Sequence, residues 1–153
     1  MTDSGGEPRW LTERQQEIWR SWLLGVARIQ DYLNDQLHED GLGLAEYEVL
    51  VTLSEAPHRT LRMSELATKV HQSRSRLTHT ATRMEQRGYL KRHACPEDKR
   101  GVLAQLTDKG FSLLEQAAPG HVAAVRRIFV DAVDPRDFEA IGRSMQAVLA
   151  VTV

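Results

Sequence analysis

The sequence predicts a mainly α-helical protein that carries one small β-hairpin. Apolar residues recur every three or four positions through most of the 153 residues, which is the spacing of amphipathic helices. Residues 90–94 and 102–106 instead alternate with period two, as strands do. With 41% hydrophobic residues, the chain can bury the core of one compact domain. We therefore expect short helices and a hairpin in the middle, between long helices at both ends.

A long helix opens the chain. Thr12, followed by Gln15 three residues later, has the pattern of a capping box and predicts a helix start at Glu13. Its apolar face consists of Ile18, Trp22, Val26, Ile29, Leu33 and Leu37. The glycine-containing stretch 41–43 should end it, and a second, shorter helix should close before Pro57.

Two further helices follow, separated by a very short turn. Ser64 is expected to cap the first and Ser73 the second, and Gly88 lies where a left-handed residue ends a helix. The second of these helices should bury Leu77, Ala81 and Met84. Cationic and hydroxyl side chains gather in its first turns and on its opposite face: Ser73, Arg74, Ser75, Arg76, Thr78, His79 and Arg83.

A charged hairpin comes next. Residues 90–94 and 102–106 are the predicted strands, and residues 96–101 are the predicted tip. The tip carries Asp98, Lys99 and Arg100. We expect the Asp98 carboxylate to orient the Arg100 side chain by a charge-assisted hydrogen bond.

Two helices complete the chain. Thr107 should cap a helix that begins at Asp108, and the Pro119–Gly120 pair should kink or split it. Asp134 followed by Pro135 predicts the start of the last helix.

Charge is distributed unevenly along the sequence. The net charge is −1, yet residues 59–100 hold 11 Lys or Arg against 4 Asp or Glu, and the remaining residues hold 9 against 17. A basic middle between acidic flanks is expected of a surface that faces a polyanion. A solvated charged surface would explain the same pattern if charge were the only signal.

This order of elements is the layout of a winged helix-turn-helix. We expect that DNA-binding region over residues 44–107, a helical dimerisation region over 10–43 and 108–153, and a flexible N-terminus over 1–9. A helix with arginines and hydroxyls on one face fits a DNA major groove, because guanidinium groups bind guanine edges while hydroxyls reach phosphates. Arg100 could enter the adjacent minor groove. The alternatives are a solvent-facing helix surface and a solubilising turn.

The residues resemble the MarR family of bacterial transcriptional regulators. The resemblance covers nearly the whole chain and rests on five segments: Leu66–Ala67, Ser73–Gly88, Tyr89–Arg92, Asp98–Gly101 and Leu106–Gly110. It implies a homodimer that binds a pseudo-palindromic double-stranded DNA operator, usually as a repressor. A small ligand or an oxidant would release this homodimer from the operator.

The family pattern also implies roles for individual residues. Arg74, Ser75, Arg76 and Thr78 would contact the major groove, and Arg100 would enter the minor groove with Asp98 bracing it. Position 79 is often arginine in the family. His79 therefore implies phosphate anchoring that is weaker or sensitive to pH.

Four residues of the first two helices are candidates for an effector cavity, which these helices help to wall in the family: Trp19, Trp22, Arg28 and Tyr47. Aromatic walls with one cation would suit an aromatic acid or a phenol as the small-molecule effector. The same residues also fit ordinary core and dimer packing, and this alternative stays open.

Several classes of protein are not expected. Cys95 is the only cysteine, so an internal disulfide is excluded, and the histidine spacing shows no metal site. The sequence has neither an apolar run long enough to span a bilayer nor a signal peptide, so we expect a cytoplasmic protein without membrane contact. We expect no cofactor and no enzymatic activity. Two alternatives remain, a winged-helix protein-interaction module without DNA binding and an oxidant sensor that acts through Cys95.

Overall fold

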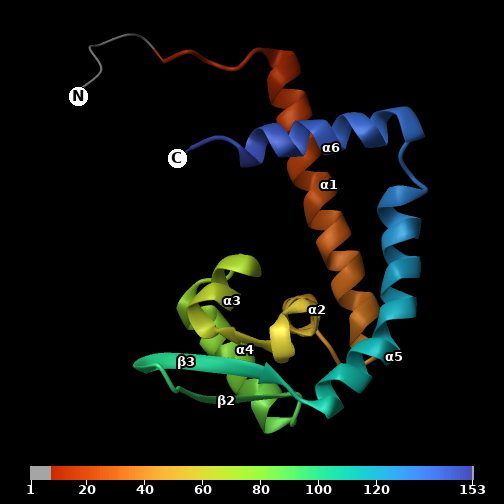
Figure 1. Ribbon diagram of the computed structural model, residues 1–153. Helices are drawn as coiled ribbons and strands as arrows, with labels where there is room; N and C mark the ends of the chain where they lie inside the picture. The colour runs from red at the N-terminus through yellow and green to blue at the C-terminus, as the bar shows by residue number, and fades with distance from the viewer. Residues whose placement is uncertain (1–7, 153) are drawn as a thin grey trace.

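This computed structural model describes residues 8–152 (Figure 1). Helices and one small sheet, joined by short loops, form this part of the chain. The prediction of a mainly helical protein with a β-hairpin is confirmed. Helices α2, α3 and α4 and the sheet form one lobe, from which α1, α5 and α6 extend (Figure 1). The predicted flexible segment over 1–9 lies outside the described residues, apart from residues 8 and 9.

The first helix begins where its capping box predicts. Helix α1 spans Glu13–His38, and the Thr12 hydroxyl accepts a hydrogen bond from the backbone N–H of Gln15 while the Gln15 side chain accepts one from Thr12. Only the C-terminal part of its apolar face, at Leu33 and Leu37, is buried in this chain. Helix α2 follows at Leu44–Glu55, and a single 3₁₀ turn, η1, at Pro57–Arg59.

The two short helices form a helix-turn-helix. Helix α3 spans Met63–Lys69 and α4 spans Arg74–Gln86. Ser73 caps α4 as predicted, because its hydroxyl accepts a hydrogen bond from the Arg76 backbone N–H at 3.2 Å. The predicted cap at Ser64 is wrong: Arg62 holds the N-cap position, without a side-chain cap, because a strand runs directly into α3.

That strand, β1 (Thr60–Arg62), was not predicted, because three residues are too few to show a period of two. The sheet has the order β1–β3–β2, and β1 is antiparallel to β3. Strands β2 (Leu90–Cys95) and β3 (Asp98–Leu106) leave only two residues between them. The predicted tip over 96–101 is therefore too long, since β3 already begins at Asp98.

An irregularity in the pairing of β2 with β3 produces a bulge in the hairpin. Ala94 pairs with Val102, but the next residue, Cys95, pairs with Asp98. Residues 99–101 of β3 consequently have no partner on β2 and form a bulge. Bulges of this kind re-aim side chains at the edge of a sheet, and here the residue at the centre of the bulge is Arg100.

The C-terminal helices show that the split predicted as one of two outcomes at Pro119–Gly120 does not occur. Helix α5 runs from Asp108 to Val125 without being split at Pro119 and Gly120, continues as a π-helical turn, η2, over Arg126–Val130, and is followed by α6 over Pro135–Leu149. Pro119 removes the N–H donor to the carbonyl of Glu115, and both residues lie on the exposed side of the helix, where water can replace the lost hydrogen bond. Gly120 faces α1, since a Cβ atom there would lie 3.1 Å from the side-chain amide nitrogen of Gln36.

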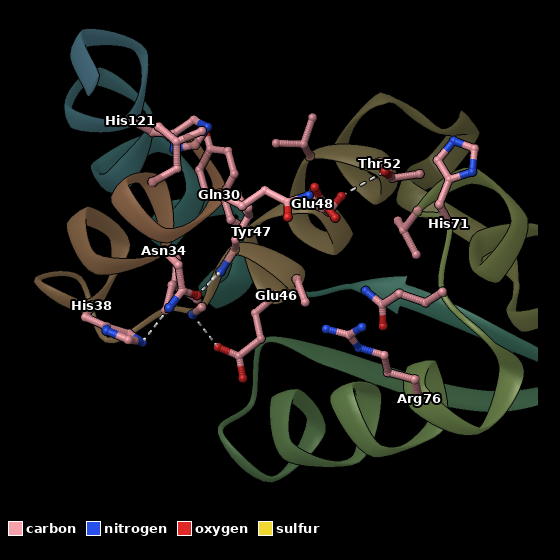
Figure 2. A pocket seen from close by; sticks show the side chains of 18 of the residues that line it. Gln30, Asn34, His38, Glu46, Tyr47, Glu48, Thr52, His71, Arg76 and His121 are labelled. Carbon is pink, nitrogen blue, oxygen red and sulfur yellow. Dashed lines mark hydrogen bonds between the residues drawn. The ribbon is translucent and has the colours of Figure 1, made fainter. Parts of the chain in front are cut away.

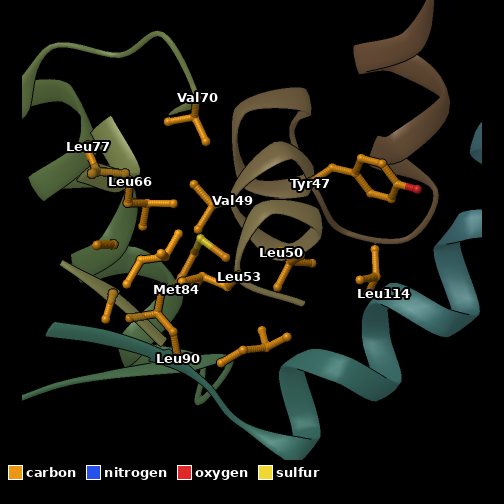
Figure 3. Close-up of a cluster of buried hydrophobic side chains, with 14 of the residues drawn as sticks. Tyr47, Val49, Leu50, Leu53, Leu66, Val70, Leu77, Met84, Leu90 and Leu114 are labelled. Atoms are coloured by element: carbon orange, nitrogen blue, oxygen red, sulfur yellow. The ribbon is translucent and has the colours of Figure 1, made fainter. Parts of the chain in front are cut away.

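The buried core lies inside the lobe (Figure 3). Fully buried side chains of α2, α3, α4 and β2, including Leu50, Leu66, Met84 and Leu90, pack against one another. By contrast, α6 buries no residue in this chain. The core therefore fixes α4 against the sheet and α2, while the long helices keep apolar surface exposed.

Candidate nucleic-acid interface

Helix α4 separates its buried and exposed side chains cleanly. Leu77, Thr80, Ala81 and Met84 are buried against the lobe. The residues predicted to contact DNA are all exposed: Ser73, Arg74, Ser75, Arg76, Thr78, His79 and Arg83. One hydroxyl is already engaged, because Thr78 donates a hydrogen bond to the Arg74 carbonyl at 2.8 Å. The structure thus gathers the predicted residues on one accessible surface.

The wing, which we define as residues 90–106, carries its cations in the bulge. Asp98, Lys99 and Arg100 are all exposed. The predicted bond between the Asp98 carboxylate and the Arg100 side chain is wrong. Oδ1 of Asp98 instead accepts the backbone N–H of Arg100 at 3.0 Å, and Oδ2 accepts Nη1 of Arg62 at 3.2 Å. These two bonds lower the pKa of Asp98.

A groove joins helix and wing. A cavity of about 340 Å³ lies between them, and its lining includes Arg74 and Thr78 of α4 together with Asp98 and Arg100 of the wing. Residues about 25 positions apart in sequence therefore face one space. Three guanidinium groups border it, because Arg62 also lines the cavity.

The base of the wing is fixed to α4 by a part-buried ion pair. Arg92 of β2 donates its backbone N–H to Glu85 at 2.7 Å and its guanidinium to the other carboxylate oxygen at 2.8 and 3.2 Å. It also donates to the Thr82 hydroxyl at 3.1 Å. These bonds lower the pKa of Glu85. They hold the strand and the helix in one fixed orientation.

The far end of α4 is tied to the connection between α1 and α2. Glu46 is buried, accepts the Gly43 backbone N–H at 3.0 Å, and lies 3.6 Å from Arg83 and 3.9 Å from Arg87. Arg87 also donates to the Gly41 carbonyl at 2.8 Å. Arg83, one of the predicted DNA contacts, thus already has an anionic neighbour.

A larger cavity of about 1230 Å³ lies between the long helices and the helix-turn-helix (Figure 2). Its walls include Gln30 and Asn34 of α1, Tyr47 of α2, and Arg76 and Arg83 of α4. Of the four candidate effector residues, only Tyr47 lines it. Trp19, Trp22 and Arg28 lie exposed nearer the start of α1 and do not border this cavity.

One wall of this cavity contains an aromatic pair. The rings of Tyr47 and His121 have centroids 4.2 Å apart, and Figure 2 shows them side by side. Burial lowers the pKa of His121 and raises the pKa of Tyr47. No residue in the described part of the chain forms a hydrogen bond with the buried Nδ1 of His121.

Residues 8–152 contain neither a candidate metal site nor a candidate membrane span. No cluster of three or more His, Cys, Asp or Glu side chains in this range could hold a metal ion. None of the helices in the same range is both long and apolar enough to cross a membrane. The thiol of Cys95 is free, and the residue is buried at 7% exposure.

Several of the residues that shape this surface were missed by sequence reasoning: Glu46, Arg62, Glu85, Arg92 and His121. Arg62 and Asp98 lie 36 positions apart, and no local pattern pairs residues at such a separation. Glu46 could have been noticed as the third residue of α2, where an acid commonly bonds the N-cap.

Comparison with known proteins identifies the family. The family model described as "MarR family" matches residues 42–102. A MarR family transcriptional regulator from Streptomyces coelicolor, solved in complex with DNA, is 43% identical with a TM-score of 0.90, and the match covers 95% of this chain and 91% of that one. This chain belongs to the MarR family.

Two other MarR-type regulators are also similar to the chain. AbsC, a MarR family transcriptional regulator from Streptomyces coelicolor, is 39% identical with a TM-score of 0.87, and the match covers 93% of this chain and 96% of that one. The HTH-type transcriptional regulator MhqR of Bacillus subtilis is 29% identical over 115 residues, which are 75% of this chain and 78% of that protein. The prediction of a MarR-type transcriptional regulator is confirmed.

The MarR family match begins just before α2 and ends in β3. It therefore includes all of α4, the bulge that carries Arg100, and the Arg62–Asp98 pair. The cationic groove between α4 and the wing lies entirely within the part of the chain that matches the family model.

Proposed function

We propose that this MarR-family protein is a cytoplasmic transcriptional repressor that binds a pseudo-palindromic DNA operator as a homodimer and releases it when a small molecule binds. It acts by binding and not by catalysis. The observation that carries the proposal is the groove in which Arg74 and Thr78 of α4 face Arg100 of the wing. Arg74 of α4 and Arg100 of the wing border the same space, so they could enter the adjacent major and minor grooves of one duplex together.

In this proposal α4 reads the major groove. Its exposed arginines, Arg74 and Arg76, can each reach a guanine edge bidentately, while Ser73, Ser75 and Thr78 suit phosphates or base edges. His79 and Arg83 lie further along the helix, where phosphate contacts are expected. Glu46 lies 3.6 Å from Arg83, so the protein itself already partly balances that positive charge.

The wing reaches the neighbouring minor groove. Arg100 is the central residue of the bulge and forms no ion pair with any residue of the described range 8–152. A guanidinium with no protein partner is attracted by the negative potential of a narrow minor groove. Lys99 beside it suits the flanking phosphate backbone.

The homodimer is supported by apolar surface that a single chain leaves uncovered. Large apolar side chains on and before α1 and at the end of α6 are exposed: Trp10, Leu11, Ile18, Trp19, Trp22, Leu23, Leu24, Val148, Leu149 and Val151. Exposed apolar surface of this extent marks an interaction surface. We propose that residues 10–43 and 108–153 of two chains cover one another, which places two α4 helices on one duplex.

An aromatic or phenolic effector is proposed for the cavity of about 1230 Å³. The ring of Tyr47 offers a stacking surface, and the wall also contains Arg76 and Arg83 of α4. A ligand in this space would touch the helix that we propose reads DNA. Negative coupling requires that ligand and operator favour different positions of α4, and contact with Arg76 and Arg83 gives a ligand a direct means to shift this helix.

Selection of bound DNA from random duplexes tests the proposal. We expect enrichment of an inverted repeat whose half-sites are centred about 10 base pairs apart, one turn of the duplex. The double substitution Arg74→Ala and Arg76→Ala should abolish enrichment. Arg9→Ala, which removes one exposed cation outside the proposed dimerisation and DNA-binding regions, should leave it unchanged. Recovery of no sequence by the wild-type protein would overturn the proposal.

A further inference from the structure

Arg62 has a role that the sequence did not suggest. It is the last residue of β1 and the N-cap residue of α3, so it lies where the sheet meets the helix-turn-helix. Its guanidinium donates to Oδ2 of Asp98 at 3.2 Å, while Oδ1 of the same carboxylate accepts the Arg100 N–H at 3.0 Å. One carboxylate therefore connects Arg62 to the backbone of the bulge.

Gly101 makes this connection possible. Its φ is not in the left-handed region, so its backbone conformation does not require glycine. The surrounding space requires glycine, because a Cβ atom at position 101 would lie 2.9 Å from Nη1 of Arg62 and 3.2 Å from Cβ of Cys95. The guanidinium of Arg62 thus crosses the bulge at the one residue that has no side chain.

The energetics indicate a role other than folding. The Arg62 and Asp98 side chains are 41% and 48% exposed, and an exposed ion pair contributes little to global stability. A bulge without partners on β2, however, has few bonds to restrict it. A bond that orders such a segment before binding lowers the entropy lost on binding.

We propose that Arg62 is a positioning residue for DNA binding: through Asp98, and across Gly101, it holds residues 99–101 in one conformation so that Arg100 is ordered before DNA arrives. This proposal rests on the proposed function, because it assigns the wing a DNA contact through Arg100. The competing role for Arg62 is direct contact with a phosphate, and the two roles make different predictions.

Operator titrations with Arg62 and Arg100 variants separate these roles. Arg62→Ala should weaken binding roughly threefold to tenfold, and Arg62→Lys should restore part of the loss because an ammonium can still donate to Asp98. In an Arg100→Ala background, Arg62→Ala should have almost no further effect, and the slope of affinity against salt should not change. Equal losses in both backgrounds, with a slope lower by about one, would overturn the proposal in favour of a phosphate contact.

Gly101 provides a second, independent variant. Gly101→Ala should displace the Arg62 guanidinium and so reproduce the loss caused by Arg62→Ala. Combined with Arg62→Ala, it should add little. Full additivity would show that the two residues do not act through one contact, and it would contradict the proposal. The Arg62→Ala and Arg62→Lys pair decides the matter if the glycine variant does not fold.

Hydrogen exchange in the DNA-free protein tests the same contact without using the proposed function. Arg62→Ala should accelerate exchange of the Arg100 amide severalfold, while amides of β1 and α4 and the melting temperature stay as in the wild type. Unchanged exchange at Arg100 would overturn the positioning role whether or not the protein binds an operator. Accelerated exchange in a protein that binds no operator would instead support the contact and place the failure in the proposed function.

Discussion

Arg100 and Asp98 carry opposite charges, yet we expect both to strengthen operator binding. Arg100→Ala removes the cation of the bulge and should weaken binding by about 1–3 kcal/mol per half-site. Asp98→Ala should also weaken binding, although it removes a charge that repels phosphate, because the Arg100 backbone and Arg62 lose their shared acceptor. Titration of one labelled operator at matched ionic strength checks both signs, and tighter binding by Asp98→Ala would refute the bracing role.

The pKa of Asp98 predicts how this effect depends on pH. The backbone N–H of Arg100 and, secondarily, the Arg62 guanidinium lower that pKa, so the folded protein favours the carboxylate. The contribution of the Asp98 carboxylate to bracing the bulge is therefore fully present above pH 3.8, the ordinary pKa of this group. It is lost as the pH falls through the lowered pKa. Between about pH 5 and pH 8 the difference between Asp98→Ala and wild type should stay constant.

Cys95→Ser should leave operator binding and its release nearly unchanged. The residue is buried at 7% exposure beside Gly101, and a reactive thiolate needs access to solvent. Titrations with and without peroxide provide the measurement. If peroxide released the wild type but not the serine variant, the protein would be an oxidant sensor.

At the residue scale, the sequence predicted which side chains of α4 are exposed, because a period of 3.6 residues separates Leu77, Ala81 and Met84 from the cations. It predicted the wrong partner for Asp98. Arg100 is the nearer cation in sequence, but the bulge brings only its backbone N–H to the carboxylate, while Arg62 arrives from a strand 36 positions earlier.

At the scale of elements, the Arg92–Glu85 pair should fix the wing to α4. Arg92→Ala removes a part-buried guanidinium and its bonds to Glu85 and Thr82, and we expect a loss of about 1–2 kcal/mol in the free energy of unfolding. Lys91→Ala, at the neighbouring exposed position of β2, is the matched control and should cost little. Urea denaturation at neutral pH measures both.

The same pair predicts a response to acid. Hydrogen bonds from Arg92 lower the pKa of Glu85, so its stabilising contribution is present above the ordinary value of 4.5 and is lost as the pH falls through the lowered value. Arg92→Ala should therefore lose less stability than the wild type over this acid range. Equal acid sensitivity of the two proteins would show that the pair does not stabilise the wing.

Helices were predictable as elements because their start signals are local. The capping box at Thr12, the cap at Ser73 and the Asp134–Pro135 start all lie where the sequence placed them. The strand β1 and the bulge of β3 were not predictable, since both exist only through pairing with residues far along the chain. Pro119 and Gly120 gave a local signal of a break, but α5 continues through both positions.

At the scale of the whole molecule, the uncovered apolar surface predicts an obligate homodimer. Light scattering should give twice the chain mass of 17.3 kDa at micromolar concentration. Leu149→Glu, which places a charge on the exposed end of α6, should shift the protein towards monomer and weaken operator binding. A wild-type protein that stays monomeric would contradict the proposed arrangement of two α4 helices on one duplex.

We propose that the basic middle of the chain, on α4 and the wing, faces DNA. The dependence of operator affinity on salt tests it most directly, because phosphates neutralised by Lys or Arg release counterions. If a dimer neutralises at least about six phosphates, affinity should fall roughly a thousandfold or more between about 50 and 200 mM salt. An affinity that hardly changes over this range would contradict the account.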